Sequence, residues 1–462
     1  MPEVFSLEEK GLSKMLKVED ILSATGGDII STNSLLFPSV SIDSRTIKDG
    51  ELFIALKGSR FDGHDFLQDA LKKGDGAIVS QLPVSHIEGK TIIIVKDTLK
   101  ALQDLAKFMR LKKDIPVIGI TGSNGKTTTK EAVAKILSST YKVLKNFGNL
   151  NNHIGLPLSL TRIQEDDEVA VLEMGASRPG DIKELCNIAR PDYGILTNIS
   201  PSHLEGFKDI KTLKNTKLEI LEGIKVAIVN ADDTFLMEGV RSTGFKGEIV
   251  RYGINNKAEI YASDIRLEQS NSVFILHMGD ESIKVYPKIS GRFNIYNLLA
   301  AVAVGHLFNI DKELIKNALE SFKGVPMRFE ISEDKDRGLW IISDVYNANP
   351  ASMEEAIKEL VRLKKERAVA VLGDMLELGT YEKDAHKRLI KWMSELPVDI
   401  FIAVGPLMSS VASEFKHRVF KSLNSVDAGR ILKDILRKGD TILIKGSRGM
   451  RMEKVMETYY AL

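Results

Sequence analysis

The chain has 462 residues and a formal net charge of +1, and its 43% hydrophobic and 27% charged content is typical of a globular protein of about three domains. A charge so close to zero argues against a general nucleic-acid-binding surface or a membrane surface. The single cysteine, Cys186, excludes intramolecular disulfides and cysteine-ligated zinc, which suits a cytoplasmic protein, and we expect no stable membrane insertion because no apolar run approaches the roughly 18 residues of a spanning helix.

Residues 1–14 precede an internal methionine and are expected to form a leader, followed by a first unit at 15–113. Apolar runs separated by helix-length segments predict α/β layering there. A helix near Leu99–Leu111 ends in the polar stretch Lys112–Asp114, which we take as the boundary. The expected strands of this unit are Leu52–Leu56, Gly76–Val79 and Thr91–Val95.

The second unit, 114–323, opens with the apolar run Ile115–Ile118 and then Gly119–Lys130, which reads Gly-Ile-Thr-Gly-Ser-Asn-Gly-Lys-Thr-Thr-Thr-Lys. A buried strand, a glycine-rich turn and a helix that begins at Lys126 are typical of a phosphate loop. Lys126 supplies a positive charge and Thr127 a hydroxyl of the kind placed on Mg²⁺, so the pattern predicts ATP binding. The usual loop has glycine where this chain has Ile120, and an ordinary turn with a solvated lysine is the alternative.

The rest of the chain continues the α/β pattern, with one interruption. Shorter alternating runs between Glu248 and Tyr286 predict an antiparallel addition to a mainly parallel central sheet. A helix near Asn294–Phe308 then precedes a Rossmann-like α/β unit at 324–462. The expected strands are Val169–Leu172, Tyr193–Thr197 and Val226–Val229 in the central unit, and Leu339–Ser343, Ala368–Leu372, Ile400–Val404 and Thr441–Ile444 in the last.

Polar residues follow nearly every expected strand, where ligands bind in open α/β sheets. Glu173 directly follows one strand, and Asp344 and Tyr346 follow another. Helix caps alone can explain many such residues, because Asp and Asn are favoured there.

Taken together, these strings resemble the Mur ligase family over nearly the whole chain after the leader. The first unit contributes Asp43–Arg45, Leu52–Gly58 and Phe61–Phe66 to the resemblance, and the second contributes Thr121–Thr127, Asn149–Asn152, Glu173–Gly175, Ser202–Phe207 and Gly291–Asn294. The third unit contributes Asp344–Pro350, Gly373–Met375 and Lys445–Arg448. One departure is Phe293, where the family often has histidine.

The resemblance implies an ATP- and Mg²⁺-dependent amide ligase of peptidoglycan precursor synthesis. It would join D-alanyl-D-alanine to UDP-N-acetylmuramoyl-tripeptide through an acyl phosphate, releasing ADP and phosphate. The string Tyr346–Pro350 separates this member from the ligase that adds the preceding residue, whose Asp-Asn-Pro-Arg motif is absent. The third residue of the tripeptide, lysine or diaminopimelate, stays open.

The resemblance also implies roles for individual residues. ATP would be bound by the loop residues Gly122, Ser123, Asn124, Gly125, Lys126, Thr127 and Thr128, together with Asn294, Arg328, Asp344 and Tyr346. The metal ligands would be Thr127, Glu173, His203 and Lys217 as a carbamate, and the catalytic residues Lys126, Glu173, His203 and Lys217. The UDP-substrate would contact Ser44, Arg45, Gly63, His64, Asp65, Asn149, Asn151 and Asn152.

Other interpretations compete with this one. A bare lysine such as Lys217 is usually a solvated residue, and a lone histidine such as His203 usually packs or caps a helix. One alternative function is a related ligase on another substrate, such as folylpolyglutamate synthase or the ligase adding the third peptide residue. Another is a phosphate-loop protein that binds or hydrolyses nucleotide as a switch or binding module. A guanine-specific switch should carry an Asn-Lys-x-Asp string, which does not occur here. We expect a monomer.

Overall fold

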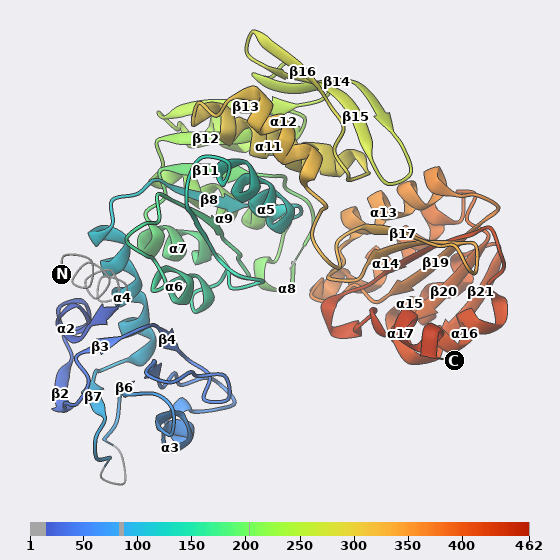
Figure 1. Cartoon of the computed structure of the whole chain (residues 1–462). Coiled ribbons are helices and arrows are strands. Elements are labelled where there is room, and N and C mark those ends of the chain that lie inside the picture. Colours follow the sequence, from blue (N-terminus) through green and yellow to red (C-terminus); the bar gives the residue numbers. More distant parts are fainter. Residues whose placement is uncertain (1–14, 83–86, 203, 462) are drawn as a thin grey trace.

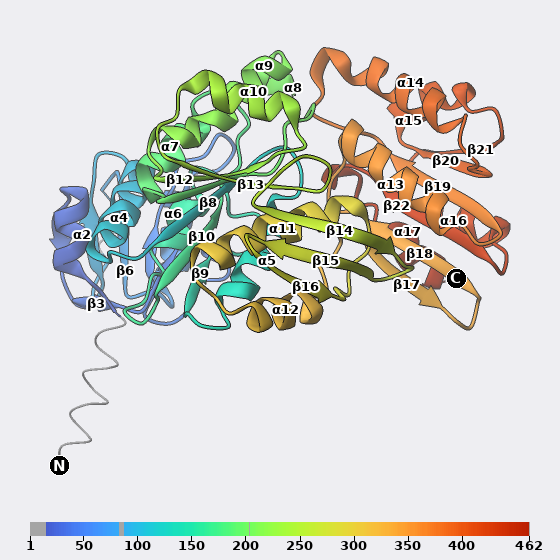
Figure 2. The ribbon, with the colours of Figure 1, turned by 90° about the horizontal axis from the view of Figure 1, so that it is seen from above.

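The computed structural model describes residues 15–82, 87–202 and 204–461, and it forms three units, each built around its own sheet (Figure 1). The expected leader lies outside the described residues. The N-terminal and C-terminal units lie at opposite sides of the central one (Figure 2). The three-unit α/β class predicted from the sequence is confirmed, whereas the predicted unit boundaries stay a prediction.

The N-terminal unit has a five-stranded sheet in the order β2-β7-β6-β5-β4, with β2 antiparallel to β7 and the other pairs parallel. Its strands are β1 (Leu16–Lys17), β2 (Asp28–Ser31), β3 (Leu36–Phe37), β4 (Val40–Ser41), β5 (Leu52–Ile54), β6 (Gly76–Val79) and β7 (Thr91–Ile94). Its helices are α2 (Val18–Thr25), η1 (Gly63–Phe66), α3 (Leu67–Leu71) and α4 (Thr98–Lys112). The strands and α4 confirm the expected elements to within two residues at each end.

The central unit has a nine-stranded sheet in the order β16-β15-β14-β13-β12-β11-β8-β10-β9. Its strands are β8 (Val117–Thr121), β9 (Val143–Lys145), β10 (Val169–Glu173), β11 (Tyr193–Leu196), β12 (Val226–Asn230), β13 (Glu248–Gly253), β14 (Ile260–Leu267), β15 (Ser272–Met278) and β16 (Glu281–Val285). Its helices are α5 (Lys126–Leu137), α6 (Gly155–Leu160), α7 (Asp181–Ala189), α8 (Leu204–Phe207), α9 (Ile210–Leu218), η2 (Glu219–Glu222), α10 (Thr234–Thr243), α11 (Arg292–Leu307) and α12 (Lys312–Ser321).

Two apolar cores cover the faces of this sheet. One packs α5, α11 and α12 against it, and the other packs α6, α7, α9 and α10. The antiparallel addition is confirmed for β14, β15 and β16, but it begins later than expected. Strand β13 pairs in parallel with both β12 and β14. Helix α10 connects β12 to β13, whereas residues 254–259 connect the end of β13 to the start of β14, which lies beside it.

The C-terminal unit has a six-stranded sheet in the order β17-β18-β22-β19-β20-β21, parallel except for β17. Its strands are β17 (Glu330–Asp334), β18 (Leu339–Asp344), β19 (Arg367–Gly373), β20 (Ile400–Val404), β21 (Arg418–Ser422) and β22 (Asp440–Lys445). Its helices are α13 (Pro350–Leu363), η3 (Gly379–Tyr381), α14 (Glu382–Met393), α15 (Pro406–Val411), η4 (Ala412–Glu414), α16 (Ser425–Ile435), η5 (Arg448–Met450) and α17 (Lys454–Ala461). Helices α13, α14 and α15 share one core, and α16 and α17 the other.

Named side chains tie the units together. Arg110 of α4 is buried against the central unit and donates to the carbonyls of Ala189 at 3.0 Å and Arg190 at 3.3 Å, at the end of α7. Helix α13 bonds the central unit at both ends. Asn349, its N-cap, donates to Asn124 Oδ1 at 2.6 Å, and Arg362 in its last turn donates to the carbonyls of Leu267 and Glu268 at 3.0 and 3.1 Å.

Within the described residues, no helix combines the length and the apolar character that crossing a bilayer requires.

Candidate active site

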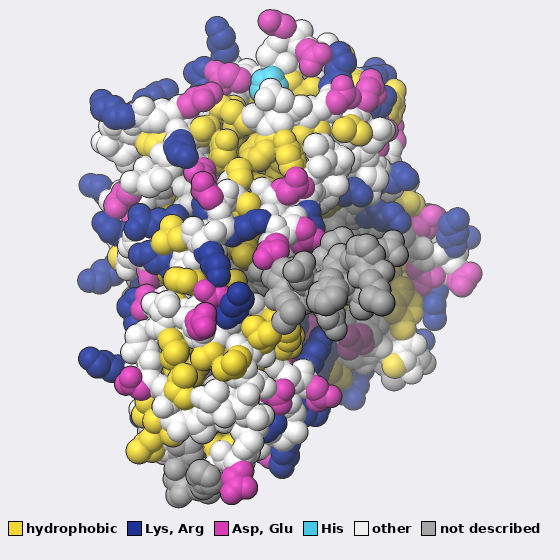
Figure 3. Space-filling view, turned by 60° about the vertical axis from the view of Figure 1, so that its left-hand side comes forward, with side chains coloured by type: hydrophobic (Ala, Val, Ile, Leu, Met, Phe, Trp, Pro, Cys, Tyr) yellow, Lys and Arg dark blue, Asp and Glu magenta, His cyan; other side chains and the backbone are white. Residues whose placement is uncertain are grey.

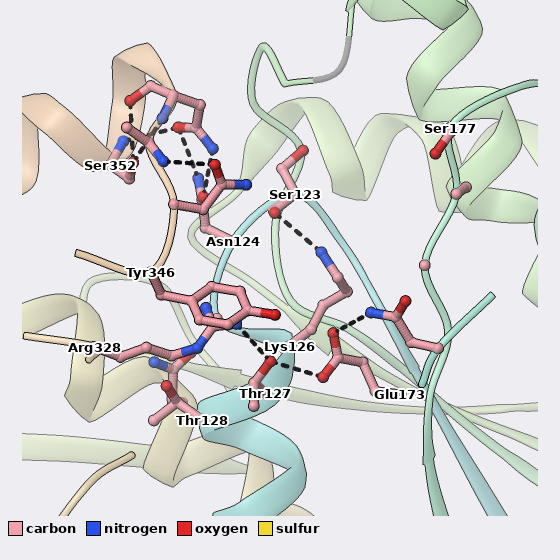
Figure 4. A pocket seen from close by; sticks show the side chains of 18 of the residues that line it. Ser123, Asn124, Lys126, Thr127, Thr128, Glu173, Ser177, Arg328, Tyr346 and Ser352 are labelled. Atoms are coloured by element: carbon pink, nitrogen blue, oxygen red, sulfur yellow. Dashed lines mark hydrogen bonds between the residues drawn. The ribbon is translucent and has the colours of Figure 1, made fainter. Parts of the chain in front are cut away.

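A cavity of about 550 Å³ lies between the central and C-terminal units, at the carboxyl ends of β8, β10 and β18 (Figure 4). The central unit contributes the phosphate loop and Glu173, and the C-terminal unit contributes Arg328 and Tyr346. Residues of both units that line it include Ser123–Thr128, Asn151–His153, Glu173, Gly175–Arg178, Asp181, Phe293, Asn294, Asn297, Arg328, Phe329, Asp344, Tyr346–Asn349, Ser352 and Lys445. Because residues of both units line the cavity, a ligand bound there can contact both units at once.

The phosphate loop connects β8 to α5, and two of its glycines are required by the backbone. Gly122 has φ 142° and Gly125 has φ 83°, conformations that side-chain-bearing residues rarely adopt. A Cβ atom on Gly125 would lie 2.2 Å from Asn297 Oδ1, and one on Gly122 would lie 2.0 Å from Thr197 Oγ1. The loop therefore keeps the tight form that lets backbone N–H groups approach phosphate oxygens. The helix begins at Lys126, as the sequence predicted.

Lys126 folds back over this loop. Its Nζ donates to the carbonyls of Gly122 at 2.9 Å and Ser123 at 3.2 Å (Figure 4). Burial lowers the pKa of Lys126, and the positive charge of Arg328 acts in the same direction, while the Glu173 carboxylate opposes both. An added anion next to Lys126 would reverse this effect, so the loop is arranged to receive negative charge.

Glu173, at the end of β10, is buried and its carboxylate bridges two elements. Thr127 donates to Oε2 and Asn151 donates to Oε1, both at 2.7 Å. The described contacts to this carboxylate come from neutral groups, although a buried carboxylate favours a positive partner. A carboxylate next to a hydroxyl is the kind of hard oxygen donor set that Mg²⁺ takes, so these residues fit a magnesium ion.

Arg328 reaches this group from the C-terminal unit. It donates to Thr127 Oγ1 at 2.9 Å, and its guanidinium lies 4.0 Å from the centre of the Tyr346 ring (Figure 4). Asp344, at the end of β18, accepts from buried Lys445 at 2.5 Å and from the backbone N–H of Phe329 at 3.2 Å. Lys445 holds Asp344 and Arg328 lies on Tyr346, so the C-terminal unit presents a fixed set of charged and aromatic groups to the loop.

Asn294 and Phe293 form another part of the wall, at the start of α11. Asn294 is buried, donates to the Ser290 carbonyl at 2.7 Å and accepts from Asn297 at 3.3 Å. Phe293 packs edge-on against Phe329 with ring centres 4.9 Å apart. The aromatic pair and the amides together form a surface of suitable chemistry for a flat heterocyclic base.

Lys217 is buried in α9 and is not a solvated residue. It is 2% exposed, and burial together with the charge of Lys126 lowers the pKa of Lys217 to about 7, against the pull of Asp181, Glu219 and Glu173. A buried amine with this pKa is largely neutral at mildly alkaline pH, and a neutral amine is the form that reacts with carbon dioxide.

His203 lies outside the described residues, so its predicted role stays a prediction. Among the residues that are described, no cluster of three or more His, Cys, Asp or Glu side chains is arranged to hold a metal ion. Of the proposed metal ligands Thr127, Glu173, His203 and Lys217, only Glu173 is a described side chain of these four types. A carbamate on Lys217 and the His203 side chain would have to supply the other ligands.

The residues predicted to bind the UDP-substrate lie apart from this cavity, except Asn151 and Asn152, which line it. Ser44 and Arg45 follow β4, and Gly63, His64 and Asp65 follow β5, so the parallel pairing of these strands brings both loops to one sheet edge. Other partners engage several of these side chains. Arg45 pairs with Asp43 at 2.6 Å, and His64 contacts Asp62 at 2.6 Å and accepts from the Ser80 N–H at 2.9 Å.

The asparagines after β9 divide between the cavity and the local fold. Asn152 accepts from the N–H groups of Ile154 at 3.1 Å and Gly155 at 2.8 Å, where α6 begins. Asn151 faces Glu173, as described above, whereas Asn149 is exposed and does not line the cavity.

Several lining residues were not assigned from the sequence. Lys445 and Asn349 fall within the quoted family strings, but nothing in the sequence indicated that they would face the loop. Asn297 and Ser177 carried weaker signals still. Asn297 lies one turn after Asn294 and directly before the apolar run Leu298–Val304 of α11, and this position is the one signal that could have revealed it.

The fold and the site together define a nucleotide-dependent ligase architecture, and the comparisons with known proteins agree. Family models described as "Mur ligase family, catalytic domain", "Mur ligase middle domain" and "Mur ligase, glutamate ligase domain" match residues 37–110, 120–305 and 327–448. The chain belongs to the Mur ligase family.

Individual relatives are similar over most of their length. A UDP-N-acetylmuramoyl-tripeptide–D-alanyl-D-alanine ligase from Bacillus subtilis is 37% identical over 428 residues, covering 90% of this chain and 92% of the relative. The enzyme of the same name from Escherichia coli is 33% identical over 425 residues, covering 90% and 92%.

Solved structures are similar as well. A crystal structure of MurF from Acinetobacter baumannii has a TM-score of 0.89 at 30% identity, covering 98% of this chain and 100% of that one. MurF ligase from Thermotoga maritima in complex with ADP has a TM-score of 0.80 at 30% identity, covering 92% and 97%.

Proposed function

We propose that this chain is an ATP-dependent amide ligase that joins D-alanyl-D-alanine to UDP-N-acetylmuramoyl-tripeptide, giving ADP and phosphate. The observation that carries the proposal is the junction of Thr127, Glu173 and Arg328 inside one cavity. A phosphate-loop hydroxyl, a buried carboxylate and a guanidinium from the facing unit meet there. The relatives described above carry this activity in their names.

The reaction has three steps. The terminal phosphoryl group of ATP is transferred to the carboxylate of the tripeptide, giving an acyl phosphate and ADP. The amine of D-alanyl-D-alanine attacks the acyl carbon, and the tetrahedral intermediate expels phosphate, which leaves the amide. A carboxylate is a poor electrophile, so it is first activated by phosphorylation. Because ATP supplies this activation, the protein's part is to position the reacting groups and to offset negative charge.

The residues divide these tasks between the two units. Lys126 and the loop N–H groups bind the phosphates, and Arg328 balances charge on the transferred group from the other side. The Phe293 ring and Asn294 bind the adenine, while Asp344 and Tyr346 fix the ribose side. The UDP moiety lies on the N-terminal unit near Ser44, Arg45 and the Gly63–Asp65 turn.

A magnesium ion would be held by Thr127 and Glu173, with His203 and carbamylated Lys217 as its further protein ligands. It would supply charge neutralisation at the terminal phosphate and at the acceptor carboxylate. Without the carbamate, the Lys217 ammonium has hydrogen-bond donors alone and cannot coordinate a cation.

The proposal extends to the setting of the enzyme. We infer that it works as a monomer in the cytoplasm on nucleotide-linked precursors, without nucleic acid. We divide it into units at 15–113, 114–323 and 324–462. The near-zero net charge supports the absence of nucleic acid, and the single cysteine, which permits no intramolecular disulfide, supports a reducing cytoplasm.

The test is phosphate release from magnesium-ATP by the full chain. Release is expected only when both UDP-N-acetylmuramoyl-tripeptide and D-alanyl-D-alanine are present, with tripeptide ending in lysine and in diaminopimelate assayed in parallel. Steady hydrolysis with neither substrate would instead indicate a nucleotide switch. Turnover with a folate and glutamate, but not with the muramoyl peptide, would indicate the related ligase.

A further inference from the structure

Asn146 lies directly after β9, behind the wall of the active-site cavity, and is fully buried. Both the nitrogen and the oxygen of its side-chain amide form hydrogen bonds. Nδ2 donates to the carbonyls of Leu150 at 2.8 Å and Glu173 at 3.0 Å, and Oδ1 accepts from the N–H of Glu173 at 2.9 Å. One side chain therefore holds both main-chain groups of Glu173 and also the loop that leads to Asn151.

Lys130 supports Asn146 from the phosphate-loop helix. It lies one turn after Lys126 in α5, its side chain is fully buried, and its Nζ donates to the Asn146 carbonyl at 2.8 Å. A second contact, to Glu131 at 3.1 Å, balances its charge. A buried lysine is costly unless it is paired, so its presence here indicates a specific task for this contact.

These bonds form a chain from α5 through Asn146 to Glu173. We infer that Asn146, held by Lys130, is a positioning residue that sets the Glu173 carboxylate at the distance from Thr127 that the metal ion requires. The inference rests on the proposed function, because it concerns the magnesium site of that reaction. Neither residue lines the cavity, so each acts through Glu173 and not on a substrate.

The chemistry of the amide explains why asparagine stands here. Replacement by aspartate would keep an acceptor for the Glu173 N–H but would place a carboxylate against the carbonyls of Leu150 and Glu173, which need donors. Alanine would remove this partner from three main-chain groups, of which the N–H and the carbonyl of Glu173 are in buried bonds. Either change would shift the end of β10, and partners of metal ligands typically contribute about 10–100-fold to metal affinity or activity.

The experiment measures the effect of magnesium on nucleotide affinity, which does not require turnover. A non-hydrolysable ATP analogue is titrated calorimetrically into the full chain with and without MgCl₂, for the parent and for Asn146→Asp and Asn146→Ala. We expect the metal-free affinity to stay within about twofold and the enhancement by magnesium to fall by about tenfold or more. Folded variants that keep the parental enhancement would overturn the inference.

A matched control separates position from stability. Asn230, at the end of β12, is also a buried amide, and it bonds the Thr197 carbonyl and the Asp232 N–H without contacting Glu173. Asn230→Ala should lose stability but keep the magnesium enhancement. An equal loss in this control would assign the effect to general destabilisation and would also overturn the inference.

Lys130→Met provides a second test if the Asn146 variants do not fold, because methionine is also unbranched, is shorter by the terminal nitrogen and lacks the donor. It should lower the magnesium enhancement while leaving metal-free affinity in place, and an unchanged enhancement would count against the inference. If the parent chain itself binds no nucleotide, the proposed function fails and not this step.

Discussion

Arg328 is one of the side chains through which the C-terminal unit contacts the phosphate loop directly, and its contacting group is planar. Arg328→Lys keeps the charge but loses both the forked donors and the stacking on Tyr346. We expect kcat for phosphate release to fall on the order of 10²-fold, which is typical for the loss of one donor to a transition state. Steady-state kinetics with both substrates measures this.

Arg337→Lys is the matched control for that change. Arg337 lies in the same unit, outside the cavity, with its guanidinium 5.2 Å from the centre of the Tyr460 ring. Its replacement should leave kcat near the parental value. A parental kcat for Arg328→Lys would contradict the assigned role of the arginine fork.

Lys217 gives a prediction in which the direction of the pH effect is fixed. Because burial lowers the pKa of this amine to about 7, its neutral fraction rises as pH increases through that value. Carbon dioxide adds to neutral amines, so carbamylation should increase between about pH 6 and about pH 8. Nuclear magnetic resonance with isotopically labelled bicarbonate measures the carbamate signal, which should be missing in Lys217→Met.

The same residue can be tested by activity. Lys217→Ala should abolish turnover, since the anionic ligand is lost, and a small carboxylic acid should restore part of it. Full turnover of the unrescued variant would remove Lys217 from the metal site.

At the scale of elements, α13 is the helix that couples the C-terminal unit to the phosphate loop. Its N-cap residue, Asn349, accepts from the N–H of Ser352 at 2.9 Å and also donates to Asn124. Asn349→Asp keeps the cap, because a carboxylate accepts equally well, but removes the donor. We expect unchanged thermal stability and a rise in KM for ATP of roughly 5–10-fold, for a hydrogen bond of about 1 kcal/mol.

Asn349→Ala completes that comparison, because it removes the cap and the donor together. It should lower the unfolding temperature and raise KM for ATP as well. If Asn349→Asp bound ATP like the parent, the pair of asparagines would have a role in folding alone.

The elements that sequence predicted well are those whose signal is local. Strand β6 was predicted without error because its apolar run, Gly76–Val79, is bounded by turn residues, and the start of α5 followed from the loop motif. Strand β2 was not predicted, since three of its four residues are exposed and show no alternation. Strand β13 was placed in the right region but given the wrong pairing, because its local sequence does not distinguish a parallel neighbour from an antiparallel one.

The residues of the candidate site also differ in how far the sequence could predict them. Lys126 and Thr127 were identifiable because the loop is contiguous in sequence. Lys445, Asn297 and Asn349 come from elements far apart in the chain, and their meeting at the loop depends on how two units pack. Asn146 lies just before the quoted Asn149–Asn152 string but outside it, and its contacts are with main-chain groups, which sequence does not distinguish.

At the scale of the whole molecule, Arg110 attaches the N-terminal unit to the central one. Its side chain bonds three carbonyls, of Lys113, Ala189 and Arg190, and burial lowers the pKa of Arg110, with Asp192 opposing. Arg110→Met should destabilise the chain by about 2–4 kcal/mol, because buried carbonyls lose their donors. Urea unfolding measures this change.

Nucleotide binding should persist in folded Arg110→Met, since the cavity is built from the other two units. The affinity for the ATP analogue, measured in the same preparation, therefore distinguishes an effect on the junction of the N-terminal and central units from an effect on the cavity between the central and C-terminal units. Loss of that affinity in a folded protein would show that the N-terminal unit shapes the phosphate loop.

The distribution of charged side chains on the surface agrees with the near-zero net charge of the chain. Figure 3 shows Lys and Arg interspersed with Asp and Glu on one face, without a continuous patch of one sign. This distribution is consistent with attraction of anionic substrates by local groups inside the cavity and not by a general field.

Two units supply the cavity wall, and neither unit alone provides all of its lining. A compound that wedges between Asn124 and Asn349 would prevent the halves from meeting, and it would need no likeness to ATP or to a peptide. Inhibitor design against this protein can therefore begin at the contact between the central and C-terminal units.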